Sequence, residues 1–137
     1  MKNLKSLVLL AFLVVSTQAW AQKKKQYKVQ TIAFYNVENL FDTINDPLKD
    51  DEKSPIMEIQ GDRSKIYKDK ISKLARVISD IGYDMTKTTP TILGVAEVEN
   101  KQVLEDLINH PKLKDSDYGI IHFDSPDKRG IDVALLY

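Results

Sequence analysis

The sequence predicts an α/β domain that follows a short export signal. Two apolar runs rich in β-branched residues, at 29–37 and 91–98, indicate buried strands. Two segments with apolar residues at spacings of three and four, at 64–81 and 101–109, indicate amphipathic helices. Two further apolar runs near the C-terminus complete the order strand, helix, strand, helix, strand, strand, which favours an α/β fold.

The first 21 residues have the layout of a secretory signal peptide. Lys2 and Lys5 precede an apolar run from Leu7 to Val15, and Ala19-Trp20-Ala21 places small residues one and three before a cut after Ala21. The run is shorter than the roughly 20 residues of a membrane-spanning helix. An uncut N-terminal anchor is the alternative interpretation. No cysteine follows the cut, so we expect no stable membrane anchor and an exported protein, periplasmic or secreted.

The composition limits the classes of function. The chain has 20 basic and 20 acidic side chains, and because the signal holds two lysines and no acid, its removal leaves 18 and 20. This balance argues against a strongly basic protein that coats nucleic acid. Residues 22–28, with three consecutive lysines, are interpreted as a solvated basic leader, and a basic contact patch is the alternative. The chain has no cysteine, so packing alone must stabilise the domain.

The first predicted helix is the clearest element of the chain. It begins after an aperiodic segment, Asn45–Gly61, which carries the acidic run Asp50-Asp51-Glu52 and is interpreted as a long surface loop. Asp62 or Ser64 is expected to cap the helix, and Gly82 to end it. Its predicted buried face consists of Tyr67, Ile71, Leu74, Ala75, Ile78 and Ile81.

The second half of the chain is predicted to form a strand, a short helix and a hairpin. Pro90 bounds the continuous apolar run at 91–98, which is typical of a strand covered on both faces. Asn100 is expected to cap the helix at 101–109. The strands at 118–123 and 131–137 are joined by a long polar turn, as in a hairpin.

Polar residues follow two of the buried strands, where open α/β sheets bind ligands. Asn36 interrupts an apolar strand and could serve a phosphate oxygen and a neighbouring carboxylate. An Asx-turn that closes the strand is the alternative, which composition alone favours. Glu97 follows a fully apolar strand, where a carboxylate is costly unless it is paired or bound to a metal ion. For Glu99, an ordinary charge at the start of the next helix is the favoured interpretation.

Three motifs carry a resemblance to a known family. They are Phe-Tyr-Asn-Val-Glu-Asn-Leu-Phe at 34–41, Ile-Leu-Gly-Val-Ala-Glu-Val-Glu-Asn at 92–100 and Asp-Lys-Arg-Gly-Ile-Asp-Val-Ala-Leu-Leu-Tyr at 127–137. In this order they resemble the first motifs of the endonuclease/exonuclease/phosphatase superfamily, which includes deoxyribonucleases, abasic-site endonucleases, sphingomyelinases and inositol polyphosphate phosphatases. The resemblance implies that residues 29–137 form the N-terminal half of a four-layer α/β/β/α sandwich with a mixed, mainly antiparallel sheet.

The resemblance also implies roles for individual residues. Asn36 matches the family asparagine that orients the catalytic carboxylate and the phosphate, and Glu97 matches the metal-ligand glutamate. Glu38 matches a second acidic ligand that some members have. Arg129 lies in the loop that approaches substrate and is expected to bind phosphate, with a solvated arginine as the alternative. Asp132 is interpreted as an unremarkable polar position on its strand rather than a support residue.

The implied chemistry is metal-assisted phosphoester hydrolysis. Mg²⁺, with Mn²⁺ or Ca²⁺ as alternatives, is the expected cofactor, and the preferred substrate is nucleic acid cut by an exported, monomeric endonuclease. The alternative to a nuclease within the superfamily is a phosphatase or a sphingomyelinase-type phosphodiesterase, which would hydrolyse a different phosphoester substrate. A non-catalytic envelope binding module with the same fold is the alternative from another class.

The later motifs of the superfamily, Gly-Asp-x-Asn and Ser-Asp-His, are absent from these 137 residues. His110 and His122 match neither motif and are interpreted as surface or structural residues. Because the sequence also ends at Tyr137 inside an apolar strand, we expect an N-terminal fragment that is inactive alone.

Overall fold

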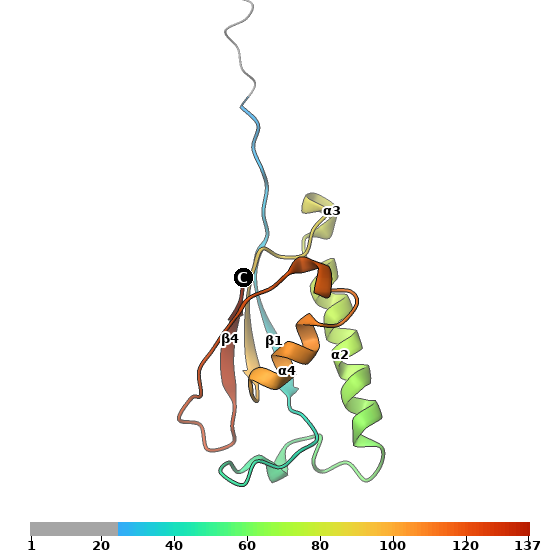
Figure 1. Ribbon diagram of the computed structural model, residues 1–137, viewed down its shortest axis with the longest axis vertical. Coiled ribbons are helices and arrows are strands. Elements are labelled where there is room, and N and C mark those ends of the chain that lie inside the picture. The colour runs from blue at the N-terminus through green and yellow to red at the C-terminus, as the bar shows by residue number, and fades with distance from the viewer. Residues whose placement is uncertain (1–24) are drawn as a thin grey trace, which may run out of the picture.

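The computed structural model describes residues 25–137, so the predicted signal peptide lies outside the described residues. One four-stranded sheet carries helices on one of its faces (Figure 1). Among residues 25–137, none of the helices combines the length and apolar character that crossing a membrane requires. In chain order the elements are β1 Ile32–Leu40, η1 Asp51–Lys53, α2 Arg63–Asp80, α3 Tyr83–Thr86, β2 Ile92–Val98, α4 Lys101–Ile108, η2 Lys114–Ser116, β3 Ile120–His122 and β4 Asp132–Leu136.

The sheet is mixed, with strand order β1-β2-β4-β3. β1 and β2 pair in parallel across the α2 connection, whereas β4 is antiparallel to both β2 and β3. This confirms the predicted α/β class, and the predicted hairpin is formed by β3 and β4. Because the carboxyl ends of parallel strands lie at the same edge, the ends of β1 and β2 meet.

The predicted helix boundaries follow from their capping residues. Asp62 caps α2, its side chain accepting a hydrogen bond from the Lys65 amide at 3.0 Å. Gly82 follows the helix in the left-handed conformation, with φ 69°. A Cβ atom there would lie 2.3 Å from the Thr31 hydroxyl, so both conformation and space require glycine. Asn100 caps α4 by accepting from the Val103 amide at 3.0 Å.

The core lies between the helices and one face of the sheet. Leu93 and Val95 of β2 are fully buried there, and α2 contributes Ile71, Leu74, Ala75 and Ile78 as predicted. α4 contributes Val103, Leu104 and Leu107. Of the other predicted residues, Tyr67 is half-buried against this core, whereas Ile81 lies beyond the end of α2 and outside the core. Amphipathic periodicity therefore placed most of the helix contacts correctly.

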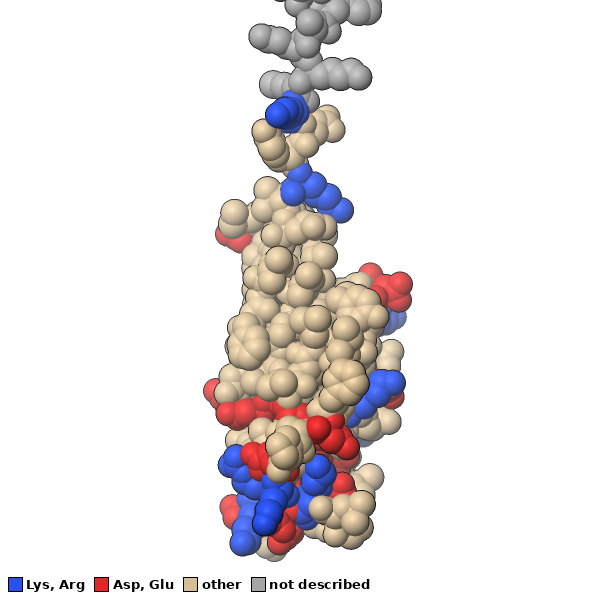
Figure 2. Space-filling model, turned by 90° about the vertical axis from the view of Figure 1, so that its left-hand side faces the viewer, with Lys and Arg blue, Asp and Glu red and all other residues tan. Residues whose placement is uncertain are grey.

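The opposite face of the sheet is apolar and open among the described residues. Figure 2 shows it as a broad tan surface above a band of acidic side chains. The prediction that β2 is covered on both faces is therefore wrong for this part of the chain, because Ile92, Gly94 and Ala96 remain only half-buried. The exposed apolar residues of the sheet and its ends include Ile32, Phe34, Ile121, Phe123, Val133 and Tyr137.

Residues 29–31 were predicted to begin the first strand, but β1 starts at Ile32 and runs three residues beyond Val37. The continuation comes from a bulge, since Leu40 still pairs with Val98 after the register shifts beyond Asn36. Helix α3 and the two 3₁₀ turns were not predicted, because elements of three or four residues carry no periodic signal.

The one-sided core gives a stability prediction. Leu93→Ala is expected to lower the free energy of unfolding by about 2–5 kcal/mol, because it removes buried contacts and leaves a cavity. Leu48→Ala, at a position that is 88% exposed, is the matched control and should change it by less than about 0.5 kcal/mol. Urea denaturation measures both, and equal effects would show that Leu93 does not lie in the core.

Candidate functional site

The candidate site lies at the edge where β1 and β2 end. Asn36 pairs with Ala96, and beyond this point both strands leave regular register. Glu38, Asn39 and Glu97 all have positive φ angles, of 55°, 57° and 64°. Such conformations are unfavourable for residues other than glycine and persist only where surrounding contacts fix them. Their concentration here marks a locally constrained turn.

The carboxylate of Glu97 is held by two donors from β1. The Asn36 side-chain amide donates to Oε1 at 2.7 Å, and the backbone amide of Asn39 donates to Oε2 at 3.1 Å. The side-chain oxygen Oδ1 of Asn36 accepts from the Glu38 backbone amide at 2.7 Å, which forms an Asx-turn. The Asx-turn and the contact with a neighbouring carboxylate are therefore both present, since the turn aims the side-chain amide at Glu97, and the predicted role toward phosphate stays a prediction.

Lys70 of α2 supports this turn from below, and the sequence analysis missed it. Its ammonium donates to the Asn39 carbonyl at 2.9 Å and also to the Glu38 carbonyl. Burial lowers the pKa of Lys70, while the carboxylates of Glu38 and Glu97 oppose that shift. One signal was present, because Lys70 follows Tyr67 by three residues and precedes Leu74 by four, which places it on the apolar face.

Glu97 fits a divalent cation by its donor chemistry. A carboxylate has about four lone-pair positions, and the two hydrogen bonds from Asn36 and Asn39 leave capacity on both oxygens. Hard cations prefer such oxygen ligands, and donors that orient a ligand strengthen a site. Glu38, the second predicted ligand, is exposed. Its hydrogen bonds with Asn36 and Lys70 involve its backbone amide and its backbone carbonyl.

Arg129 lies in the loop between β3 and β4, and its guanidinium forms a fork with Asp127. Nε donates to Oδ1 at 3.1 Å and Nη2 to Oδ2 at 2.8 Å. These bonds lower the pKa of Asp127 to about 2. They are also the main cause that raises the pKa of Arg129, to which the charge of Glu97 adds. The structure thus places Arg129 within the electrostatic reach of Glu97 but engaged with its own loop.

Asp132 and His122 form a buried pair behind this loop. His122 Nε2 lies 2.9 Å from Asp132 Oδ2, and the other Asp132 oxygen accepts from the Ser125 amide at 2.8 Å. Asp132 is therefore an anchor of the loop, and its interpretation as an unremarkable strand position was wrong. With Asp124, these residues are a group of three potential metal ligands within 4.8 Å among the described residues, to which Glu38 and Glu97 do not belong. Both Asp132 oxygens already have partners, so we interpret the group as structural.

Glu99 lies directly before the cap of α4, as the sequence favoured, but it is not an ordinary charge there. It is buried, and its Oε2 accepts from the Asp42 amide at 2.7 Å. Burial, followed by the nearby charges of Asp42 and Asp51, raises the pKa of Glu99 to about 7. Periodicity could not show this, because the burial comes from the loop after β1 folding over the helix start.

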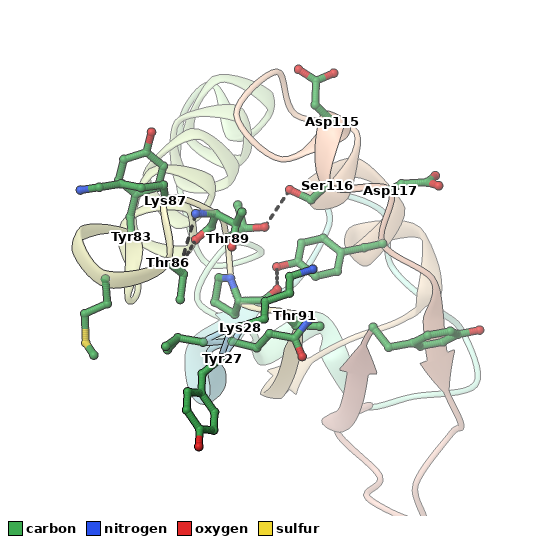
Figure 3. Close-up of a pocket in the computed structure, with 17 residues that line it drawn as sticks. Tyr27, Lys28, Tyr83, Thr86, Lys87, Thr89, Thr91, Asp115, Ser116 and Asp117 are labelled. Carbon is green, nitrogen blue, oxygen red and sulfur yellow. Dashed lines mark hydrogen bonds between the residues drawn. The ribbon is translucent and has the colours of Figure 1, made fainter. Parts of the chain in front are cut away.

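A larger hollow of the described chain lies at the other end of the sheet. It has a volume of about 1080 Å³, and Figure 3 shows residues of the leader, α3 and η2 around it. Two hydrogen bonds lie in its wall, one from Thr89 to Ser116 at 2.9 Å and one from the Tyr118 hydroxyl to the Pro90 carbonyl. No group of acids or bases converges there, so size alone does not make it the candidate site.

The Lys70 contacts predict a stability effect. Lys70→Met keeps the aliphatic chain but leaves two carbonyls without their donor, so the free energy of unfolding is expected to fall by about 1–3 kcal/mol. Lys70→Arg should recover part of this loss, and Lys73→Met, an exposed position on the same helix, should be neutral. Chemical denaturation measures all three, and a neutral Lys70→Met would contradict the assigned contacts.

The Glu99 environment predicts a pH effect. Its folded-state pKa of about 7 exceeds the ordinary value of 4.5, so the folded state binds the proton more tightly and stability falls as pH rises between these values. Glu99→Gln should remove this pH dependence, which amounts to about 1.4 kcal/mol for each unit by which the pKa is raised. Denaturation from pH 4 to 8 measures it, with the exposed Asp69→Asn as control. A variant that keeps the wild-type slope would disprove the assignment.

Comparison with protein families places these observations in context. Residues 31–137 match the model of the Endonuclease/Exonuclease/phosphatase family. Searches among curated proteins and among solved structures gave no match. The matched region includes all four strands and the residues Asn36, Glu97 and Arg129. The chain therefore belongs to the endonuclease/exonuclease/phosphatase family.

Proposed function

We propose that this chain contributes the Asn36–Glu97 half of the active site of an exported, metal-dependent phosphoester hydrolase. Membership in the family implies a phosphoesterase-type activity. The observation that carries the proposal is the Glu97 carboxylate, fixed at 2.7 Å by Asn36 and at 3.1 Å by the Asn39 amide. A carboxylate in this position, with unused lone pairs, is arranged to bind a cation rather than to pair with a lysine or an arginine.

Family members typically use a divalent metal ion, and the donor set here fits Mg²⁺, with Mn²⁺ or Ca²⁺ as alternatives. Glu97 would hold the ion, with Glu38 as a second acidic ligand. When bound, such an ion supplies electrostatic stabilisation of a phosphoryl group and its leaving oxygen. Asn36 contributes by fixing the carboxylate, which limits the reorganisation needed on binding.

The preferred substrate is a nucleic-acid phosphodiester. Two adjoining loops bring cations close to the site, since the Asp50 amide of one donates to the Lys128 carbonyl of the other at 2.7 Å. Lys49 and Lys53 lie on the first loop, and Lys128 and Arg129 on the second. Figure 2 shows Lys and Arg side chains gathered below the acidic band. A local set of cations supports binding of successive phosphates although the chain as a whole is neutral.

Two structural features complete the proposal. The open apolar face supports a four-layer arrangement in which a second sheet of the same domain covers it, because water-exposed patches of this kind are rarely left free. The layout of residues 1–21 supports export to the periplasm or the medium. A single copy of the domain would then suffice for activity.

The proposal predicts the effect of Glu97→Gln on the complete gene product. Nicking of supercoiled DNA in Mg²⁺ should fall by about 100-fold or more, because the substitution removes the charged ligand. Calorimetric Mn²⁺ binding should weaken in parallel, and chelator should stop the wild-type reaction. Glu58→Gln, an exposed loop position, is the matched control.

Unchanged activity and metal affinity in Glu97→Gln would show that Glu97 is not a metal ligand. Inactivity on DNA and RNA, with turnover of a phospholipid or an inositol phosphate, would instead change the substrate class. A wild-type protein that binds no metal ion and hydrolyses no phosphoester would point to a binding module.

A further inference from the structure

Lys70 contacts the turn that holds Glu97, and the proposed function gives it no role so far. It lies on α2, is half-buried, and its ammonium donates to the backbone carbonyl of Glu38 and, at 2.9 Å, to that of Asn39. Among residues 25–137, the ion pairs do not include Lys70. Its charge is therefore directed at the backbone of the turn and not at an acidic side chain.

A single peptide group links Lys70 to Glu97. The Glu38 carbonyl, which accepts from Lys70, and the Asn39 amide, which donates to Glu97 Oε2 at 3.1 Å, belong to the same peptide bond. This bond is trans, since the described residues contain no cis peptide. In a planar trans peptide the carbonyl and the amide point in opposite directions. The ammonium on one side and the carboxylate on the other therefore fix the orientation of this group.

The backbone on both sides of this peptide is in an unfavourable conformation. Glu38 and Asn39 have φ angles of 55° and 57°, in the left-handed region that residues other than glycine seldom adopt. Such a conformation persists only where the surrounding contacts hold it. Lys70 supplies a charged donor to the carbonyl between the two residues, and hydrogen bonds from charged donors are stronger than those from neutral ones. Without it, the peptide is free to relax away from Glu97.

The ammonium, the peptide and the carboxylate form a chain of charge, dipole and charge. The carbonyl end of the peptide faces Lys70 and its amide end faces Glu97, so each hydrogen bond polarises the peptide in the direction that strengthens the other. The charges of Glu38 and Glu97 also act on Lys70, since they oppose the fall in its pKa that burial causes. Loss of the ammonium should therefore weaken the Asn39 donor and loosen the Glu97 carboxylate.

We propose that Lys70 is a positioning residue for Glu97, acting through the Glu38–Asn39 peptide, and that it raises the affinity of this carboxylate for a divalent cation. The inference rests on the proposed function and adds to it a residue of α2, outside the sheet edge that carries the site. Removal of a group that orients a metal ligand commonly weakens metal binding by about 10- to 100-fold.

The test is the sign of the change in Mn²⁺ affinity caused by Lys70→Met in the complete gene product, measured by calorimetry. If Lys70 acted by its charge alone, its removal would raise the affinity, because a nearby positive charge repels the ion. If Lys70 positions Glu97, the affinity should fall about tenfold, near the lower end of the usual range because the lost repulsion opposes the effect. Lys70→Arg, which keeps a charged donor, should recover part of the affinity.

Two variants on the same helix are matched controls. Lys73→Met removes an exposed charge of α2 and should leave the Mn²⁺ affinity nearly unchanged. Ile78→Val, at a fully buried position about two helical turns from Lys70, lowers the stability by loss of packing and should also leave the affinity unchanged. If Ile78→Val lost as much affinity as Lys70→Met, general destabilisation would explain the effect and the inference would be overturned.

The Asn39 amide gives a second readout that requires no metal ion. With ¹⁵N-labelled asparagine, its proton resonance in the metal-free protein should move upfield in Lys70→Met, because the hydrogen bond to the carboxylate weakens. Glu97→Gln, which removes the charge of the acceptor, should move it in the same direction. Asn39→Gly identifies the resonance by its disappearance, since glycine accepts the positive φ at this position. A Lys70 that only stabilises the fold would leave this resonance in place.

These outcomes are separable from failure of the proposed function. An unchanged Asn39 resonance, or a Mn²⁺ affinity that is unchanged or higher in Lys70→Met, overturns the inference even where the wild type binds Mn²⁺ and hydrolyses a phosphoester. A wild type that binds no Mn²⁺ rejects the proposed metal site instead. In that case the Asn39 resonance alone decides whether Lys70 positions the carboxylate.

Discussion

The hydrogen bond between the Asn36 amide and the Glu97 carboxylate is the interaction around which this domain is arranged. It joins residues 61 positions apart in sequence at 2.7 Å. It requires β1 and β2 to be parallel and in one register, so that both strands end at the same edge. The connection that allows this is α2, whose Lys70 also fixes the carbonyls of the turn after Asn36. Fold and site are therefore not separable here, because the helix that completes the core also holds the turn.

The charged side chains at this edge differ in their hydrogen-bond partners and in their pKa according to how deeply they are buried. Glu97 is half-buried, is held by neutral donors and keeps capacity for a cation. Glu99 is buried deeper, and its raised pKa shows that the fold favours the protonated form. Arg129 and Asp127 form an ion pair at the protein surface, where ion pairs contribute little to stability. A chain with no net charge can thus place exposed cations of its loops near a half-buried carboxylate.

Much of this could be predicted from the sequence, for physical reasons that also explain the rest. The face of α2 and the caps Asp62 and Asn100 were predictable because helix periodicity and capping are local. Asn36 and Glu97 were predictable as neighbours only through the resemblance, since no local pattern sets the register of two strands. The burial of Asp132 and Glu99 was missed because it depends on loops that fold over them. Lys70 was not predicted because a lysine at a helix position next to the apolar face is usually solvated, and its partners are backbone carbonyls of a turn that leaves no local sequence pattern.

The open face and the polar edge place complementary demands on the same sheet. β2 is apolar on both faces, although only one of them is packed among the described residues. Gly94 lacks a side chain where the Phe34 ring lies over it, since a Cβ atom there would lie 2.5 Å from the ring. The strand can carry a charged residue only where it stops being a regular strand, and Glu97 has the positive φ that marks this point. The strained backbone is thus the consequence of ending an apolar strand on a carboxylate that must face outward. The turn at Glu38 and Asn39, where φ is also positive, is its counterpart on β1, so both strands give up regular geometry at the point where the carboxylate is oriented.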